Sequence, residues 1–534
     1  MKISSIYSDG MIMQRNKKNT ISGVLETEKS IKAELDGVSI PVDVKADGSF
    51  TVVIDEQEAG GPHVLAIGDL VIHDVLFGDV YVLGGQSNME LPVLFTADEH
   101  FDEIESADFA QIRQFEVPKV PLFGRKEEFL NGGNWVNADQ KNINSFSAIG
   151  FYFAKQKYLK DQVPVGLVQT AVGGAPVESL MSEEVLVDTF EKIYPKYESS
   201  GACNGDKSKC CLWCYKEKLA QNRDADFVAK TQKEDFEFEQ KWRSELAAKD
   251  PGTEAHWENL WNDGEGESFT MPSTFFKTKY EDLRFGSVWL QKVVNVPEEF
   301  CKGRIQLRLG TLIDSDDTYV NGVRVGGFGF KYPPRRYWLP DGLLKPGKNV
   351  ISVRLVMTGN IGGAVIETPF CLKNEDHEIS LYGEWKVRMG IKADEPLRGQ
   401  TFFIWAPTAL YNSMLYPIRN YNCKAILFYQ GESNGEYPQY YGDLLVKMVE
   451  EWRVLFGQVP FLMAEITMWE GEGPEYGEDV FLDIRMAQRE VVGRIPDAYL
   501  IKTDDIGQFN DLHPQNKKDV AVRFFETYES LNQK

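Results

Sequence analysis

Apolar and polar residues alternate in short segments over the first part of the chain. These segments lie at residues 21–25, 30–35, 42–44, 50–54 and 63–67. Turn-forming residues separate them, as at Asp36-Gly37 and Asp47-Gly48. Strands with this spacing and alternation are typical of antiparallel sandwiches, so we expect residues 1–75 to form a small N-terminal β-sandwich.

The pattern changes near residue 76 to strands that alternate with helices. Residues 78–83 and 165–169 are short apolar runs, whereas residues 146–159 show the spacing of an amphipathic helix. This alternation favours a parallel sheet covered by helices on both faces. The sequence therefore predicts that residues 76–198 form the first half of a three-layer α/β domain.

Residues 199–372 interrupt the α/β pattern. They begin with a cysteine-rich stretch and a charged run at 224–249, which is typical of a helix with a solvated face. From about residue 271 the pattern is that of strands, and Asn321-Gly322 is a strong hairpin signal. We expect an insertion that contains a helical segment followed by a β domain.

The α/β pattern resumes in residues 373–534, which we expect to form the second half of the interrupted domain. Predicted strands lie at 424–429, 460–466 and 498–503, and predicted helices at 408–418, 437–456, 485–492 and 517–530. No window approaches the roughly 18 unbroken apolar residues of a membrane span. A membrane-spanning segment is therefore not predicted.

The net charge of the chain argues against two classes of binding partner. The chain holds 58 Lys and Arg residues against 81 Asp and Glu residues, which gives a formal net charge of -23 at pH 7. Such a chain repels nucleic acid and anionic membrane surfaces, so neither is an expected partner. A neutral ligand is compatible with this charge.

The cysteines and the N-terminus favour a cytoplasmic location. The first residues lack the apolar core of roughly 7–15 residues that a secretory signal requires. The seven cysteines lie at positions 203, 210, 211, 214, 301, 371 and 423. We expect reduced thiols in a cytoplasmic protein. Cys211 and Cys214 form a C-x-x-C pair that suits zinc, but no second pair accompanies them, so no metal site is predicted.

A candidate nucleophile follows the first apolar run of the α/β pattern. The run ends in Gly84-Gly85-Gln86-Ser87, where glycine permits a sharp backbone turn. A hydroxyl at the carboxyl end of such a strand lies where open α/β sheets bind ligands. We interpret Ser87 as a nucleophile; in isolation the motif is equally compatible with a simple polar turn.

The search for a base is short because the chain has only six histidines. A serine hydroxyl needs a histidine to take its proton and a carboxylate to orient the imidazole. Only His513 combines a carboxylate two residues away, at Asp511, with a proline beside it, at Pro514. We predict a catalytic set of Ser87, His513 and Asp511, with Asp504 and Asp505 as alternatives for the acid.

A second glycine pair follows the apolar run at residues 165–169. Gly173-Gly174 leaves backbone N–H groups uncovered by side chains, which is what an oxyanion hole requires. Together with the N–H of Ser87, these groups are the predicted backbone donors. A tight turn without catalytic function is the alternative interpretation.

Four blocks of the sequence, in this order, resemble those of the SGNH hydrolase superfamily: Gly85-Gln86-Ser87-Asn88-Met89, Gly173-Gly174, Tyr429-Gln430-Gly431-Glu432-Ser433-Asn434 and Asp511-Leu512-His513-Pro514. Within it, nearly the whole chain, including residues 8–14, is similar to sialate O-acetylesterase-like carbohydrate esterases. The resemblance implies a flavodoxin-like, three-layer hydrolase domain with an inserted galactose-binding-like jelly roll. It also implies serine ester hydrolysis of acetylated sugars without a metal, nucleotide or redox cofactor.

The resemblance assigns further roles. It implies that the side-chain amide of Gln430 is an oxyanion donor, at a position where many SGNH enzymes use asparagine. Many relatives space the acid and base as D-x-x-H, which would place Asn510 where the acid stands. This chain departs from that spacing with D-x-H through Asp511, and some relatives use a dyad instead.

The expected partner is an O-acetylated saccharide, and two substrate classes remain open. Acetylated sialic acid needs a bidentate arginine for its carboxylate, for which Arg453 and Arg485 are candidates. Acetylated hemicellulose oligosaccharides, such as those of xylan, xyloglucan and mannan, need none. A third hypothesis is a non-catalytic carbohydrate-binding protein, but the joint presence of Ser87, His513 and Gln430 argues against it.

The inserted β domain also contains aromatic candidates for carbohydrate binding. Tyr332, Tyr337 and Trp338 lie beside Arg335-Arg336. Because the insertion separates the predicted catalytic blocks, we expect it to form one wall of the substrate cleft. The alternative is that it only supports the cleft.

Overall fold

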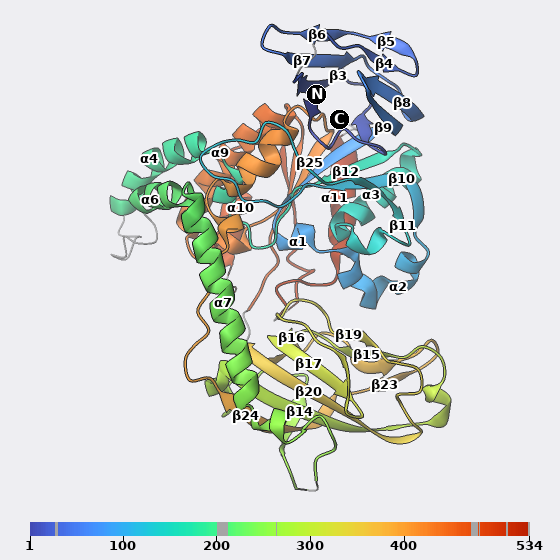
Figure 1. Cartoon of the computed structure of the whole chain (residues 1–534), viewed down its shortest axis with the longest axis vertical. Helices are drawn as coiled ribbons and strands as arrows, with labels where there is room; N and C mark the ends of the chain where they lie inside the picture. The colour runs from blue at the N-terminus through green and yellow to red at the C-terminus, as the bar shows by residue number, and fades with distance from the viewer. Residues whose placement is uncertain are drawn as a thin grey trace.

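The computed structural model describes residues 1–26, 30–199, 212–262, 264–470, 479, 481–508 and 511–531. It is a mixed α/β structure with several sheets. In Figure 1 three parts follow one another along the long axis: the N-terminal strands, a central α/β part, and a β part formed by the insertion. The long helix α7 (Ala225–Lys249) runs along one side from the central part to the insertion.

The N-terminal strands are β1 (Lys2–Ile3), β2 (Ile12–Gln14), β3 (Asn19–Val24), β4 (Ala33–Leu35), β5 (Val38–Ile40), β6 (Val42–Val44), β7 (Ser49–Ile54) and β8 (Gly60–Ile67). Four of them form a sheet of order β1-β3-β7-β6. The others pair with one another and with β9 (Leu70–Gly85), a strand of 16 residues. This strand runs on into the central sheet, so the boundary expected at residue 75 falls inside it.

The central sheet has the strand order β11-β10-β12-β9-β25-β26-β27. Its further strands are β10 (Asp108–Glu116), β11 (Trp135–Asp139), β12 (Val165–Gln169), β25 (Ala425–Tyr429), β26 (Phe461–Ala464) and β27 (Ala498–Ile501). All neighbours are parallel except β11, which is antiparallel to β10. Every residue of β12 and β25 is buried, as expected for a parallel sheet covered on both faces.

Helices cover this sheet in two groups. The described helices besides α7 are α1 (Ser87–Glu90), α2 (Ala97–Glu105), α3 (Ala148–Asp161), α4 (Glu183–Ser199), α6 (Leu212–Asn222), α8 (Pro251–Glu254), α9 (Pro438–Phe456), α10 (Leu482–Val492) and α11 (Lys517–Leu531). Helix α3 packs against α11, while α9 packs against α10 and α4. The two groups lie on opposite sides of the strands in Figure 1.

Short helical turns connect these elements. They are η1 (Val93–Thr96), η2 (Ile143–Ser145), η3 (Val177–Leu180), η4 (Glu281–Leu283), η5 (Glu298–Cys301), η6 (Phe403–Trp405), η7 (Tyr411–Leu415), η8 (Tyr416–Ile418) and η9 (Glu432–Asn434). The helix predicted at 408–418 consists of the two turns η7 and η8, because Pro417 lacks the N–H that a continuing helix needs.

The insertion forms antiparallel sheets of its own. Its strands are β13 (Glu267–Met271), β14 (Phe285–Val296), β15 (Gln306–Leu309), β16 (Leu312–Ile313), β17 (Ser315–Val320), β18 (Val323–Gly326), β19 (Arg336–Trp338), β20 (Gly347–Thr358), β21 (Gly363–Ala364), β22 (Phe370–Lys373), β23 (Glu378–Ser380) and β24 (Gly383–Lys392). A six-stranded sheet has the order β13-β24-β14-β20-β17-β18, and a four-stranded sheet the order β19-β15-β22-β23. These strands continue past residue 372, where the sequence pattern placed the end of the insertion.

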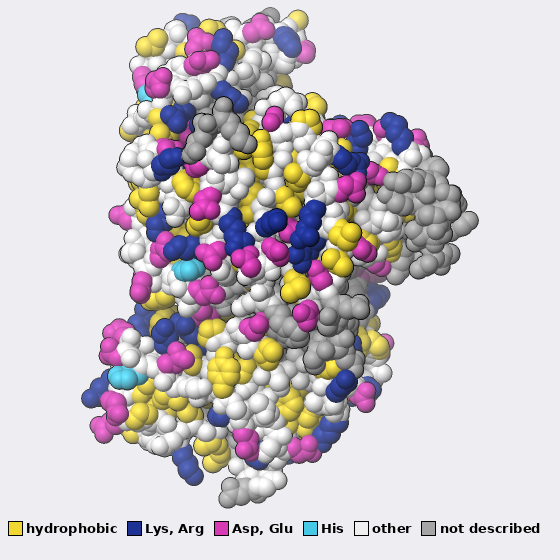
Figure 2. Space-filling view, turned by 180° about the vertical axis from the view of Figure 1, so that it is seen from behind, with side chains coloured by type: hydrophobic (Ala, Val, Ile, Leu, Met, Phe, Trp, Pro, Cys, Tyr) yellow, Lys and Arg dark blue, Asp and Glu magenta, His cyan; other side chains and the backbone are white. Residues whose placement is uncertain are grey.

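Two hydrophobic cores reflect this organisation. One core is continuous from the N-terminal strands through the central sheet, whereas the insertion encloses a separate core between residues 271 and 387. The insertion is thus packed as a unit of its own. Of the described residues, no helix has the length and apolarity that crossing a membrane requires. On the face shown in Figure 2, basic side chains lie among acidic ones.

Candidate active site

The turn that carries Ser87 is fixed by backbone packing. Strand β9 ends at Gly85, whose φ of 124° is strained for any residue with a side chain. A Cβ atom there would lie 2.0 Å from the backbone oxygen of Tyr429 in the neighbouring strand. Only glycine fits, and the chain can then turn directly into α1. Ser87 is the first residue of α1, so its N–H has no acceptor within that helix.

The structure brings His513 to Ser87 across 426 residues of sequence. The distance between His513 Nε2 and Ser87 Oγ is 2.8 Å, which is a hydrogen bond. Burial lowers the pKa of His513 to about 3, and the positive charges of Lys517 and Lys331 act in the same direction. The imidazole is therefore neutral at neutral pH and able to accept the serine proton.

Asp511 does not contact the His513 ring in this structure. Its Oδ1 accepts a hydrogen bond of 2.8 Å from the backbone N–H of His513, and burial raises the pKa of its carboxyl group. The two-residue spacing explains this contact, because an aspartate readily binds the N–H two positions later. The ring atom Nδ1 of His513 is buried and has no hydrogen-bond partner among the described residues.

The alternative acids do not fill this position. Asp505 forms an ion pair of 2.6 Å with Arg523, which is the main cause of its lowered pKa. Asp504 is exposed and, within the described part of the chain, forms no hydrogen bond or ion pair through its side chain. Asn510, the position of the acid in D-x-x-H relatives, lies outside the described residues.

The glycine pair Gly173-Gly174 lies beside Ser87, and one of its two N–H groups already has an acceptor. The N–H of Gly173 donates to the carboxylate of Glu90, which also binds Lys119. Gly174 has a φ of 76°, and its N–H has no acceptor within the described part of the chain. The backbone donors left near Ser87 are therefore those of Ser87 and Gly174.

Gln430 is fully buried, and its amide is directed elsewhere. Its Nε2 donates to Asn434 Oδ1 at 2.7 Å and to the carbonyl of Ala175 at 3.2 Å. Gln430 does not line the cavity that contains Ser87. The structure thus brings Ser87, His513, Gly173 and Gly174 together. The amide of Gln430 instead links Asn434 to the carbonyl of Ala175.

A buried polar network that the sequence did not reveal joins the segments that carry Ser87 and His513. Asn88 donates to Glu432 Oε1 at 2.5 Å and to the carbonyl of Leu512 at 3.1 Å. Lys517 donates to Asn88 Oδ1 at 2.8 Å and to the carbonyl of Pro514 at 2.6 Å. Burial lowers the pKa of Lys517 to about 8 and raises that of Glu432. The network fixes the turn of Ser87 against the loop of His513.

Ser87 and His513 open into a cavity of about 1010 Å³. Its aromatic lining residues are Phe330, Tyr332, Phe402, Trp405 and Phe481. Trp405 is held by a stacking contact with Phe402 and by a hydrogen bond of 2.6 Å from its Nε1 to the carbonyl of Gly173. An apolar cavity of this size, with a few convergent polar groups, is typical of a ligand site.

The insertion provides part of this cavity, as its position in the sequence predicted. The ring of Tyr332 contacts that of His513 edge to face, with centroids 4.5 Å apart. Tyr337 instead lies in the core of the insertion and donates to Asp316 at 2.8 Å. Trp338 faces a different cavity, and Arg335 is fully buried.

Arg336 links the insertion to the loop that carries His513. It binds both carboxylate oxygens of Asp98 in α2, at 2.9 and 2.6 Å, and donates to the Gln515 side chain at 3.1 Å. Arg308 adds an ion pair of 3.0 Å to Asp98. Because Gln515 follows His513 by two residues, this cluster anchors the loop of the base.

None of the arginines considered is available for a substrate carboxylate. Arg453 donates to the carbonyl of Pro496, and Arg485 pairs with Asp479 at 2.7 Å. Arg243 does line the cavity, but it pairs with Glu239 at 2.8 Å and its other nitrogens bind the insertion. Within the described lining, no arginine is left unpaired.

The described residues contain no group of His, Cys, Asp and Glu side chains that could hold a metal ion. The cysteine cluster at 203, 210, 211 and 214 lies outside the part of the chain whose side chains the structure describes. Cys301, Cys371 and Cys423 are free thiols.

Comparisons with known proteins identify a matching family and several similar proteins. The model of a family described as carbohydrate esterase, sialic acid-specific acetylesterase, matches residues 77–249 and 398–526. A sialate O-acetylesterase from Rattus norvegicus is 33% identical over 155 residues, and one from Mus musculus is 32% identical over 190 residues. These matches cover 26% and 30% of this chain, and 28% and 34% of the relatives' lengths.

A crystal structure of a carbohydrate acetylesterase from Xanthomonas citri resembles the whole fold. It has a TM-score of 0.54 and 19% sequence identity, and the match covers 98% of this chain and 73% of that chain. At this identity the likeness concerns the fold, including the insertion.

Proposed function

The chain belongs to the sialic acid-specific acetylesterase family of carbohydrate esterases, and we propose that it removes acetyl groups from sugar hydroxyls. This membership agrees with the resemblance found in the sequence. The observation that carries the proposal is the hydrogen bond of 2.8 Å between Ser87 Oγ and His513 Nε2 at the base of a ligand-sized cavity.

The proposed reaction is acyl transfer in two steps. Ser87 Oγ attacks the acetyl carbonyl carbon while its proton passes to His513 Nε2. The bond between this carbon and the sugar oxygen then breaks, and His513 returns the proton to the leaving hydroxyl. Water then attacks the acetyl carbon as His513 takes one of its protons. The bond between this carbon and Ser87 Oγ breaks, His513 returns the proton to Ser87 Oγ, and acetic acid leaves and ionises to acetate.

The oxyanion of each step is stabilised by backbone donors. The N–H groups of Ser87 and Gly174 have no competing acceptor in the described structure, and each such donor contributes about 10²–10³ in rate. The N–H of Gly173 stays with Glu90, and the amide of Gln430 supports the glycine turn through Ala175. Asp511 orients the base through its backbone, so the reacting pair is a Ser-His dyad.

The cavity favours a neutral saccharide over a sialic acid. A sialic acid carboxylate requires a bidentate cation, and no unpaired arginine lines the described part of the cavity. The aromatic lining instead suits the C–H faces of neutral sugar rings. Acetylated hemicellulose oligosaccharides are therefore the favoured substrates, and acetylated sialic acid is the second candidate.

We also propose a finer description of the fold. The six-stranded and four-stranded antiparallel sheets between residues 267 and 392 support a galactose-binding-like jelly roll. The parallel order of the central sheet supports the flavodoxin-like hydrolase domain.

Acetate release tests the proposal. The assay compares wild type, Ser87→Ala and Ser39→Ala on p-nitrophenyl acetate and on acetylated xylan, mannan, xyloglucan and sialic acid. Ser39 is an exposed serine of β5 that does not line the cavity, so it is the matched control. Ser87→Ala is expected to lose about 10³-fold or more, whereas Ser39→Ala keeps its activity. Equal activity of wild type and Ser87→Ala would refute the serine mechanism.

A further inference from the structure

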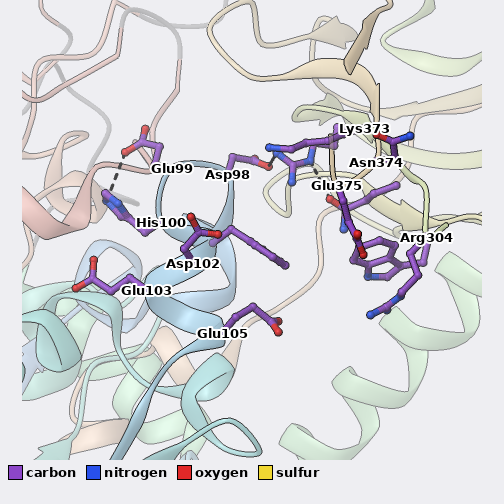
Figure 3. A pocket seen from close by; sticks show the side chains of 14 residues that line it. Asp98, Glu99, His100, Asp102, Glu103, Glu105, Arg304, Lys373, Asn374 and Glu375 are labelled. Atoms are coloured by element: carbon purple, nitrogen blue, oxygen red, sulfur yellow. Dashed lines mark hydrogen bonds and ion pairs between the residues drawn. The ribbon is translucent and has the colours of Figure 1, made fainter. Parts of the chain in front are cut away.

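A second cavity of about 720 Å³ lies where α2 faces the four-stranded sheet of the insertion. It does not include Ser87 or His513. Figure 3 shows its two walls: Asp102 and Glu105 project from α2 on one side, and Arg304, Lys373 and Asn374 lie on the other.

Each wall presents an exposed aromatic side chain. Phe101 of α2 is 42% exposed and Trp338 of β19 is 45% exposed, and both line this cavity. The guanidinium of Arg304 lies 4.2 Å from the centroid of the Trp338 ring and holds its orientation. Two large apolar surfaces thus face one polar cavity, where a bound ligand would remove them from water.

Five of the nine Asp, Glu, Lys and Arg side chains that line this cavity are unpaired within the described part of the chain. Asp102, Glu105, Arg304, Lys373 and Glu375 form no ion pair or hydrogen bond through their charged groups within the described part of the chain. Such groups remain available as hydrogen-bond donors and acceptors. Carboxylates accept from pairs of hydroxyl groups, and ammonium and guanidinium groups donate to hydroxyl oxygens.

The balance of charge selects a neutral ligand. Asp98, Glu99 and Glu103 already have basic partners. The charges left unpaired within the described part of the chain are three carboxylates, of Asp102, Glu105 and Glu375, against two cations, of Arg304 and Lys373. An anion such as a phosphate or a uronic acid would be repelled by this excess. A molecule with many hydroxyl groups and apolar ring faces matches both the polar groups and the two aromatic side chains.

We propose that this cavity binds a segment of a neutral saccharide chain, apart from the site where an acetyl group is removed. Tyr332 lines the reaction cavity and Trp338 lines the second cavity, and both belong to one short segment of the insertion. Binding at the second cavity would hold a long glycan beside the nucleophile. The kinetic consequence rests on the proposed esterase function, whereas saccharide binding does not.

Binding is tested with the full chain carrying Ser87→Ala, so that no probe is hydrolysed. The probes are unacetylated xylo-, manno- and cello-oligosaccharides, titrated by calorimetry. Adding Trp338→Ala or Glu105→Gln is expected to weaken the binding of a recognised probe about tenfold. Phe236→Ala, which alters an exposed aromatic residue of α7, is the matched control and should bind as the parent does. If Trp338→Ala does not fold, Glu105→Gln still tests whether this cavity binds the probe.

The kinetic test uses the active enzyme. Trp338→Ala and Glu105→Gln should raise KM for an acetylated polysaccharide about tenfold and leave p-nitrophenyl acetate hydrolysis unchanged. Unchanged binding and KM in both variants, or no binding of any of these probes, would overturn the inference and leave the esterase function intact. Saccharide binding that both variants weaken, in a protein without esterase activity, would support the cavity and refute the enzyme.

Discussion

Replacing Asp98 tests whether the insertion anchors the catalytic loop. The Asp98 side chain is 4% exposed and is bound by Arg336, which is 9% exposed, and by Arg308. Asp98→Asn leaves two buried guanidinium groups without a carboxylate. Removing one partner of a buried ion pair costs about 3–5 kcal/mol, so we expect a loss of unfolding free energy in that range.

Replacing Arg336 should lower the free energy of unfolding less than replacing Asp98 does, because Asp98 would keep other partners. Arg336→Met leaves Asp98 paired with Arg308 at 3.0 Å and hydrogen-bonded to Gln515 at 3.1 Å. The expected loss is about 1.5–3 kcal/mol, the value of hydrogen bonds to a charged group. Since Gln515 lies two residues after His513, both variants should also lower kcat on p-nitrophenyl acetate, about tenfold.

The assay is urea unfolding, followed by tryptophan fluorescence and circular dichroism, together with kcat. Asp317→Asn is the control, because Asp317 pairs with Arg324 on the surface of the same insertion, with side chains 34% and 56% exposed. Its second contact, with Arg354, is long at 3.8 Å, and Arg354 keeps its closer partner Asp250 at 2.7 Å. Its cost should stay below about 1 kcal/mol. If Asp98→Asn lowers the free energy of unfolding no more than this control and keeps its kcat, Asp98 does not anchor the loop that carries His513.

The pH dependence of the anchor has a definite sign. Burial alone would raise the pKa of Asp98, but Arg336 and Arg308 lower it overall. The stabilisation is therefore complete above the ordinary aspartate pKa of about 3.9 and is lost as pH falls through the lowered value. The stability gap between wild type and Asp98→Asn should close at acidic pH; a gap that stays constant would contradict the assignment.

Three further predictions concern the reacting groups. Because the pKa of His513 is lowered to about 3, kcat/KM should be retained at pH 5, below the usual histidine pKa of about 6.5; a loss centred near 6.5 would contradict this. Lys517→Met removes a positive charge that lowers the pKa of His513, so the acid limb of the pH profile should move to higher pH. It also removes the hydrogen bond to Asn88, so kcat should fall. An acid limb that does not move would show that Lys517 does not affect the pKa of His513. Gly85→Ala places a Cβ atom 2.0 Å from the Tyr429 oxygen and should destabilise the protein by more than about 3 kcal/mol, measured by thermal unfolding against Gly37→Ala, which has open space; equal midpoints would refute this.

Local patterns were sufficient to predict the central strands and the meeting of Ser87 with His513. The apolar run at 78–83 lies within β9, and the runs at 165–169 and 424–429 correspond to β12 and β25. Parallel strands place their carboxyl ends at one edge of a sheet, so residues that follow them converge there. The prediction therefore did not require any knowledge of side-chain contacts.

Other features depend on contacts that no local pattern encodes. Lys517 and Asn88 are 429 residues apart in sequence, so their hydrogen bond had no local signal. The carboxylate of Asp511 binds its own loop, and the amide of Gln430 binds Asn434 in the same turn. The motif suggested that Asp511 contacts the His513 ring and that Gln430 contacts the oxyanion. In the structure both side chains instead bind groups close to them in sequence, which a motif alone does not predict.

The family match separates the segments that contain the proposed reacting residues from the insertion that contacts them. The match covers residues 77–249 and 398–526, which contain Ser87, the glycine pair and His513, but not the strands of the insertion. The insertion nevertheless supplies Tyr332 against the His513 ring and Arg336 against the loop of this base. The reaction type therefore belongs to the segments shared with the family, whereas the cleft wall and the position of the base depend on the insertion. Changes at Tyr332 or Arg336 are therefore expected to alter both KM and kcat, which makes the insertion part of the proposed enzyme.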